Sequence, residues 1–243
     1  MLSSRAIVLS RENFGEADRY LQLFTRDWGL ISVLAKSARK SKRRYIGGMD
    51  LFCHNEIVLR GDPRERPYLV ELTVLNAFTG IREDMDRVMT AGKAAQWVRK
   101  LANTAVPMPG VYSLLGQTLA LLEKEKDPER ILLLQLVFQL KLLDQLGLKP
   151  RMDSCTRCSE PRVTPGGVFD LDAGGLLCEN CLGQRSVAHS MQLGSAECMM
   201  LDQGDRLKLT QWENFVFPPP PTRNLLRLTT QFASFHTQTH LPL

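Results

Sequence analysis

The chain has 243 residues, of which 44% are hydrophobic and 23% are charged, and its formal net charge is +5. This composition suits a protein that buries a core without a disulfide framework, and the excess of positive charge favours an anionic partner. The N-terminus lacks the long apolar region of a secretory signal, and the most apolar segment, residues 131–146, is too short and too often interrupted to span lipid. We therefore expect a cytosolic protein without a membrane segment.

The first third of the chain has short apolar stretches separated by turn residues. Candidate strands cover residues 6–10, 20–25, 30–36, 52–60 and 68–78. Turns that contain glycine or proline separate them, as antiparallel pairing requires. Five short strands joined in this way predict a small β-barrel.

A cluster of cations directly follows the third candidate strand. Six cations and no acid occupy residues 36–44, and an aromatic residue follows. Small five-stranded barrels bind single strands by combining cations along the backbone with aromatic rings under the bases. We expect salt-sensitive nucleic-acid binding with little sequence preference, although a charged loop that is merely solvated stays an alternative. The expected contact residues, here called the basic loop, are Lys36, Arg39, Lys40, Lys42, Arg43, Arg44 and Tyr45.

After residue 80 the apolar residues follow a helical period instead. We expect helices over residues 85–101 and 112–124, and a third that begins after Asp127-Pro128 and ends at Gly147. The third is so apolar that other helices must cover it. Further helices are expected at 191–203 and 222–237. The predicted fold class is thus α+β, with a barrel domain at 1–80 and an α-helical domain at 81–243.

Two Cys-x-x-Cys pairs interrupt the helical domain. Each pair, Cys155/Cys158 and Cys178/Cys181, can supply two corners of one tetrahedron, and glycine pairs between them suit tight turns around short strands. Four cysteines close the coordination shell of a zinc ion, so the role of the metal should be structural. We predict one structural Zn²⁺ in a zinc-ribbon-like module at about residues 151–186, against the alternative of four reduced thiols or a redox pair.

No pattern points to catalysis. A phosphate-cradling loop and a zinc-deaminase signature are missing, and the four histidines have no evident partner. The acid pairs Asp84/Asp86 and Asp170/Asp172 could serve a metal-dependent nuclease, but such spacing is common on solvated turns. We therefore do not expect an enzyme. Residues 218–221 are four prolines that could bind a polyproline-recognising partner or form a rigid entry to the last helix.

Several segments resemble the RecO family of bacterial recombination mediators. These are GEADRYL at residues 15–21, GLISVLAKSARK at 29–40, and QLKLLDQLGLKP at 139–150 followed by the first cysteine pair, with a compatible last helix from Leu225 to His236. The resemblance runs through most of the chain. It implies an OB-fold followed by an α-helical domain with a zinc module.

The resemblance also implies a function and partners. Family members bind single- and double-stranded DNA, anneal complementary strands and help to load recombinase onto DNA coated by single-strand-binding protein. The implied partners are RecR, the acidic C-terminal tail of single-strand-binding protein and, indirectly, the recombinase, at the bacterial nucleoid. A zinc-ribbon scaffold that binds RNA or acts in transcription is the alternative, because a fold alone does not determine the nucleic acid.

Overall fold

The structure is a computed structural model that describes residues 1–41, 44–161, 166–182, 189–216 and 222–243. The internal contacts divide the chain into two compact units, residues 1–125 and 126–243. Each unit is described by itself below. The domain boundary expected near residue 80 stays a prediction.

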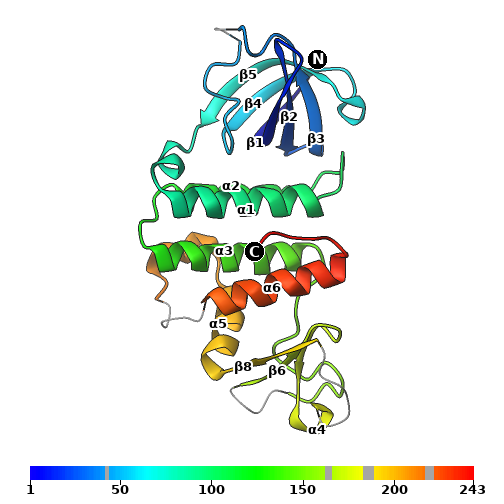
Figure 1. Cartoon of the computed structure of the whole chain (residues 1–243), viewed down its shortest axis with the longest axis vertical. Helices are drawn as coiled ribbons and strands as arrows, with labels where there is room; N and C mark the ends of the chain where they lie inside the picture. The colour runs from blue at the N-terminus through cyan, green and yellow to red at the C-terminus, as the bar shows by residue number, and fades with distance from the viewer. Residues whose placement is uncertain (42–43, 162–165, 183–188, 217–221) are drawn as a thin grey trace. The chain divides into compact units, whose positions relative to one another are not determined.

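Five strands form a closed barrel in the first unit (Figure 1). Neighbouring strands pair in antiparallel fashion except β3 and β5, which pair in parallel through the single register pair Leu34 and Tyr68. The order around the barrel is β1-β2-β3-β5-β4, a five-stranded barrel of the OB type, as predicted. The strands are β1 (Leu2–Phe14), β2 (Asp18–Thr25), β3 (Gly29–Ala35), β4 (His54–Arg60) and β5 (Tyr68–Asn76).

Alternating side chains fill the barrel. Residues of β2, β3 and β4 point inward at every second position, because successive side chains in a strand face opposite sides. In β1 the run from Ala6 to Leu9 is buried on both faces, and the side chain of Ile7 lies against Gly116 of a neighbouring helix. The buried aliphatic core includes Val8, Leu21, Leu23, Ile31, Val33, Ile57, Leu59 and Leu69.

Two helices complete the first unit. A short 3-10 turn, η2 (Thr79–Glu83), leads into α1 (Met85–Leu101), and α2 (Pro109–Leu122) follows. The carboxylate of Asp84 caps α1 by accepting from the backbone N–H of Arg87 (3.0 Å). His54 Nε2 of β4 lies 2.8 Å from the hydroxyl of Tyr112 in α2, so a side-chain hydrogen bond joins helix and barrel. Between β4 and β5 lies the 3-10 turn η1 (Pro63–Glu65).

The second unit is organised around α3 (Pro128–Gln145), whose side chains are buried on most sides. It begins as the sequence indicates, with Asp127 as the cap and Pro128 in the first turn. Two further helices, α5 (Ser195–Arg206) and α6 (Thr222–Thr237), pack against it, with η3 (Leu209–Asn214) between them. The proline run at 218–221 lies outside the described residues.

A small module interrupts this unit. Its strands β6 (Gly167–Asp170), β7 (Gly175–Leu177) and β8 (Ser190–Leu193) form a sheet in the order β7-β6-β8, with the short helix α4 (Glu179–Leu182) after β7. The helix expected from residue 191 was therefore wrong at its start, because residues 191–193 pair with β6 and the helix begins at Ser195. Parts of the predicted module, residues 162–165 and 183–186, lie outside the described residues.

None of the helices that the structure describes combines the length and the apolar character needed to cross a lipid bilayer.

Candidate nucleic-acid interface and metal centre

The basic loop begins where β3 ends. Lys36, Arg39, Lys40 and Arg44 are all exposed, whereas Lys42 and Arg43 lie outside the described residues. The guanidinium of Arg39 donates to the carbonyl oxygens of Gly15 (3.4 Å) and Glu16 (3.2 Å), which ties the loop to the turn between β1 and β2. The structure thus brings the four described cations together at one end of the barrel.

Tyr45 does not occupy the place expected of a stacking residue. Its ring is only 6% exposed and belongs to the barrel core, and its hydroxyl donates to the carbonyl oxygen of Leu69 (3.0 Å). Burial raises the pKa of this hydroxyl, so it stays a donor. We therefore correct this expectation: the ring of Tyr45 helps to hold the loop on the barrel and has no free face for a base.

Tyr68 presents the exposed ring instead. Its side chain is 40% exposed at the start of β5, and the ammonium group of Lys36 lies 4.4 Å from the centre of its ring. Both line a surface hollow of ≈ 390 Å³ together with Arg60 and Arg66, and the acids Asp62 and Glu65 line it as well. An aromatic ring beside cations is the combination that single-stranded nucleic acid requires.

A second hollow follows on the outer face of the barrel. It measures ≈ 220 Å³ and is lined by residues of β1, β2 and β3, among them the acid Glu12 and the ring of Tyr20, and again by Arg66. The ring of Phe14, which is 49% exposed, meets Tyr20 edge to face at a centroid distance of 4.7 Å. Arg66 therefore lies between two hollows that each contain an aromatic ring. Sequence reasoning missed Arg66, because its side chain reaches the strands from a separate loop.

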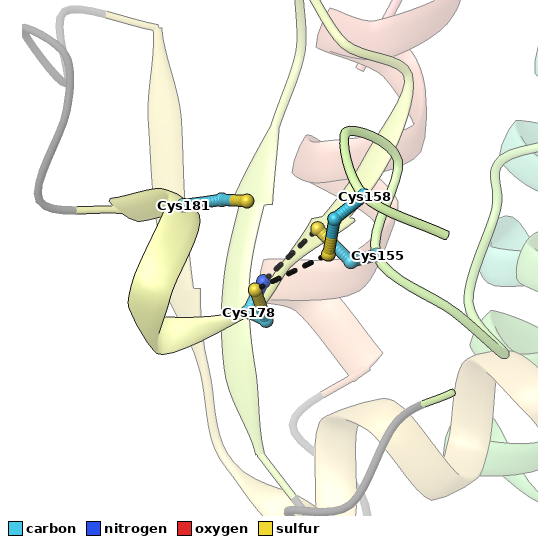
Figure 2. Close-up of side chains that lie close together, drawn as sticks. All are labelled: Cys155, Cys158, Cys178 and Cys181. Atoms are coloured by element: carbon cyan, nitrogen blue, oxygen red, sulfur yellow. Dashed lines mark hydrogen bonds between the residues drawn. The ribbon is translucent and has the colours of Figure 1, made fainter. Parts of the chain in front are cut away.

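The four predicted cysteines converge in the second unit (Figure 2). Cys155 and Cys158 lie on one tight turn, Cys178 follows β7, and Cys181 points back from α4. All four sulfurs lie within 4.8 Å of one another, and those of Cys158 and Cys178 are 3.7 Å apart. A tetrahedral zinc ion with Zn–S bonds of 2.3 Å places its ligands about 3.8 Å apart. The donor set therefore fits one metal ion that prefers thiolates.

Hydrogen bonds to sulfur prepare the site for a cation. Burial raises the pKa of the Cys155 thiol, but backbone N–H groups of Cys158, Cys178 and Arg157 lower it to about 6. The neighbouring thiol of Cys178 raises the pKa of Cys181 to about 12, because the sulfurs share protons. Such a set carries four negative charges only when a cation compensates them, as zinc does in four-cysteine sites.

A close backbone contact holds the two cysteine turns in register. The backbone N–H of Leu176 donates to the carbonyl oxygen of Arg151 (3.0 Å), and Arg151 in turn donates to Gly174 (2.9 Å). A Cβ atom on Gly175 would lie 2.2 Å from the oxygen of Arg151, so only glycine permits this approach. The segment before Cys155 is thereby fixed against the strand that leads to Cys178.

Three of the four acids in these pairs have local structural partners. Asp84 caps α1, and the carboxylate of Asp170 accepts from the N–H groups of Asp172 (2.9 Å) and Ala173 (3.1 Å). Asp172 pairs with His189 at 3.5 Å. Within the part of the chain that the structure describes, the cysteine cluster alone gathers three or more His, Cys, Asp or Glu ligand atoms closely enough to hold an ion.

An OB-type barrel and a helical unit with a module that gathers four thiols together define the class of protein. Sequence comparison is consistent with both parts: the family described as Recombination protein O N terminal matches residues 1–78, and that described as Recombination protein O C terminal matches residues 82–242. The chain therefore belongs to the RecO family, as its motifs indicated.

Curated relatives agree with this assignment. The DNA repair protein RecO of Anaeromyxobacter sp. (strain K) is 31% identical over 236 residues, which are 95% of this chain and 89% of the relative. The DNA repair protein RecO of Rubrobacter xylanophilus is 35% identical over 179 residues, 73% of this chain and 70% of the relative. The DNA repair protein RecO of Myxococcus xanthus is 34% identical over 178 residues, which are 72% of this chain and 70% of the relative.

Proposed function

We propose that this chain is a DNA-repair mediator that binds single- and double-stranded DNA, anneals complementary strands and assists recombinase loading on DNA coated by single-strand-binding protein. It makes and breaks no covalent bond. The observation that carries the proposal is the end of the barrel where the exposed cations of the basic loop lie beside the exposed ring of Tyr68. Family membership supplies the repair context.

The proposed mechanism is electrostatic. Phosphates that meet Lys36, Lys40 and Arg44 release their counterions, which makes binding strong at low salt and independent of sequence. Cations that hold two strands at one surface offset the repulsion that slows pairing. Base pairing itself then selects the complementary partner. Tyr68 and Tyr20 offer faces on which unpaired bases can stack.

The cysteine site supports this function structurally. Cys155, Cys158, Cys178 and Cys181 would hold one Zn²⁺. The ion would supply only a cross-link, because four protein ligands leave no open position for a reacting group. The module would thereby keep its short sheet folded against α6.

We further propose a place for the acidic tail of single-strand-binding protein. A hollow of ≈ 400 Å³ in the second unit has an apolar floor of Leu140, Met152 and Leu201. Lys149 and Arg206 at its rim pair with Asp205 (2.6 Å) and Asp202 (3.0 Å). The exposed Arg151 makes no ion pair with the described residues and is the cation that the tail would meet. RecR is proposed as a second partner on the family resemblance.

Annealing tests the main proposal. Complementary strands coated with the cognate single-strand-binding protein would be mixed with the native chain or with a variant in which Lys36, Arg39, Lys40, Lys42, Arg43 and Arg44 are Gln. We expect the native chain to accelerate annealing and the variant to lose most of that acceleration. Lys124→Gln/Lys208→Gln, exposed cations in other places, is the control for a general effect of charge.

The outcomes separate the two functions under consideration. If the native chain does not accelerate annealing, and binds matched RNA as tightly as single-stranded DNA, the RNA-binding or transcription scaffold is favoured.

A separate experiment tests the site for the tail of single-strand-binding protein. Arg151→Glu should weaken binding of a tail peptide about tenfold or more, since an ion pair becomes a repulsion. Unchanged peptide affinity in that variant would exclude this hollow.

A further inference from the structure

The C-terminal helix α6 has one buried face and one free face. Leu225, Leu228 and Phe232 are buried, and Thr229 donates to Gln139 of α3 at 2.5 Å. On its module side the ring of Phe232 meets Phe169 of β6 at 5.8 Å, and His236 Nε2 lies 2.8 Å from the carbonyl oxygen of Leu171. The contacts of α6 therefore determine which of its side chains remain outside.

The outer residues form a regular row. Arg223, Arg227, Gln231 and Phe235 follow one another at intervals of four and are all exposed. One step of four residues advances about 6 Å along a helix, so the row presents two guanidinium groups, an amide and a ring in sequence. Neither arginine side chain forms an ion pair or hydrogen bond with the residues that the structure describes.

The helix α6 itself carries no negative charge. No Asp or Glu occurs anywhere after Glu213, so α6 contains no acid that could neutralise its arginines. The module contributes Asp172 beyond the end of the row, where it pairs with His189. The two arginines are thus available for an anion that comes from outside the protein.

The ring at the end of the row is supported from two sides. Phe235 is 44% exposed and meets His236 nearly perpendicularly at 5.2 Å, while the ring of His189 lies 5.9 Å away. These contacts fix the orientation of the ring, so a base that stacks on it loses little entropy from ordering the side chain. The ring lies eight residues, or about 12 Å along the helix, from Arg227, which is within the span of a few nucleotides of an extended strand.

We infer that this outer row of α6 is a second contact surface for single-stranded nucleic acid, with Arg223 and Arg227 on successive phosphates and Phe235 under a base. The inference rests on the proposed function, since both concern the same DNA, but the residues belong to the other unit. The regular spacing suits a stretched strand, whose phosphates and bases repeat along its length.

Two other occupants fit less well. A duplex keeps its base faces covered, so it would use the arginines but leave Phe235 without a partner. An acidic peptide that ends in an apolar residue needs a recess, whereas Phe235 projects from the helix. The hollow at Leu201 and a further hollow of this unit, which is lined by Cys155 and Cys178, include no residue of the row.

The test compares variants of the full chain by fluorescence anisotropy with a labelled poly-dT strand and with a duplex of equal length. Arg223→Gln/Arg227→Gln should lower the salt slope of single-strand binding by about 1.4, since each phosphate contact contributes about 0.7. Phe235→Ala should weaken single-strand binding at least about fivefold and leave duplex binding unchanged, whereas Phe235→Trp should retain it. Lys124→Gln/Lys208→Gln removes the same charge elsewhere, and thermal melting verifies folding.

The results distinguish the two proposals. If the native chain binds no poly-dT, the proposed function itself fails. If the native chain binds and the α6 variants bind equally well with the native salt slope, only the second surface is wrong. Equal losses on duplex and single strand, with Phe235→Ala silent, would also overturn the inference, because the row would then contact phosphates alone.

Discussion

The barrel and the cysteine module are both built from short strands, yet they are held together in different ways. Each strand of the barrel pairs on both sides, and the side chains within form one continuous core. The strands of the module contain only four, three and four residues, and their buried apolar side chains are Val168, Phe169, Leu176 and Leu193. Such a sheet buries too little apolar surface to be stable by itself.

The comparison shows where each region obtains its stability. The barrel obtains it from hydrogen-bonded strand pairs and apolar burial, which need no ligand. The stability of the module depends on packing against the side chain of Phe232 from α6 and on a link between the two cysteine turns. A cation at the four sulfurs would therefore contribute much of its stability, as in other small metal-bound domains.

Removing one ligand should give the largest effect. We expect Cys178→Ser to lower bound zinc from one equivalent to near zero and to unfold the module, so that limited proteolysis cuts near Arg157 while the barrel stays intact. The loss should amount to several kcal/mol within the module. Zinc analysis and mass spectrometry of the fragments measure both effects.

The matched control is Cys198→Ala, which removes a buried thiol of the same unit from outside the cluster. It should retain one equivalent of zinc. A Cys178→Ser protein that still binds a full equivalent and resists proteolysis would contradict the four-ligand site.

Within the barrel, the buried Tyr45 and the exposed Tyr68 should separate stability from DNA binding. Tyr45→Phe removes the hydrogen bond to the Leu69 carbonyl and should cost about 1 kcal/mol of unfolding free energy, with no change in DNA affinity. Tyr68→Ala should weaken DNA binding and leave the unfolding free energy nearly unchanged, because its ring is exposed beside Lys36. Denaturant unfolding measures the stability of the two variants, and DNA titration measures their affinity. A DNA defect in Tyr45→Phe would restore that residue to the interface.

The smallest expected effect is a pH dependence of the first unit. Burial, with a contribution from Arg5, lowers the pKa of His54 below its usual 6.5. His54 therefore takes up its proton at a higher pH in the unfolded chain than in the folded one. Its contribution to the unfolding free energy is fully present above about pH 6.5 and declines as the pH falls towards the folded pKa. His54→Gln should flatten this decline in urea unfolding between pH 5 and 7. A slope that persists in the variant would assign it to another group.

Patterns within a few residues were predictable from the sequence. The five strands, the cap at Asp127 and the convergence of the two Cys-x-x-Cys pairs all follow from local spacing, and the structure contains them. Contacts between distant segments were not predictable in this way. β8 became a strand because β6 pairs with it, and Tyr45 became a core residue because β5 supplies a carbonyl for its hydroxyl.

The same limit explains the interface residues that were missed. Arg66 reaches two hollows because its backbone adopts a left-handed conformation, with φ 55°, after a short 3-10 turn. The free row of α6 depends on which face of the helix meets α3 and the module. The intervals of four and eight residues between Arg223, Arg227 and Phe235 were nevertheless visible in the sequence.

The parallel junction of β3 and β5 makes the barrel a closed ring with one weak seam. Only Leu34 and Tyr68 are in register there, and the N–H of Leu34 donates to Pro67 (3.0 Å). Lys36 and Tyr68 stand at this seam, so a bound strand would bridge it. A ligand that binds only the closed ring favours closure by mass action. DNA should accordingly slow hydrogen exchange at the Leu34 amide more than at amides across the barrel. The exchange rate of this amide would then report how much of the protein has DNA bound.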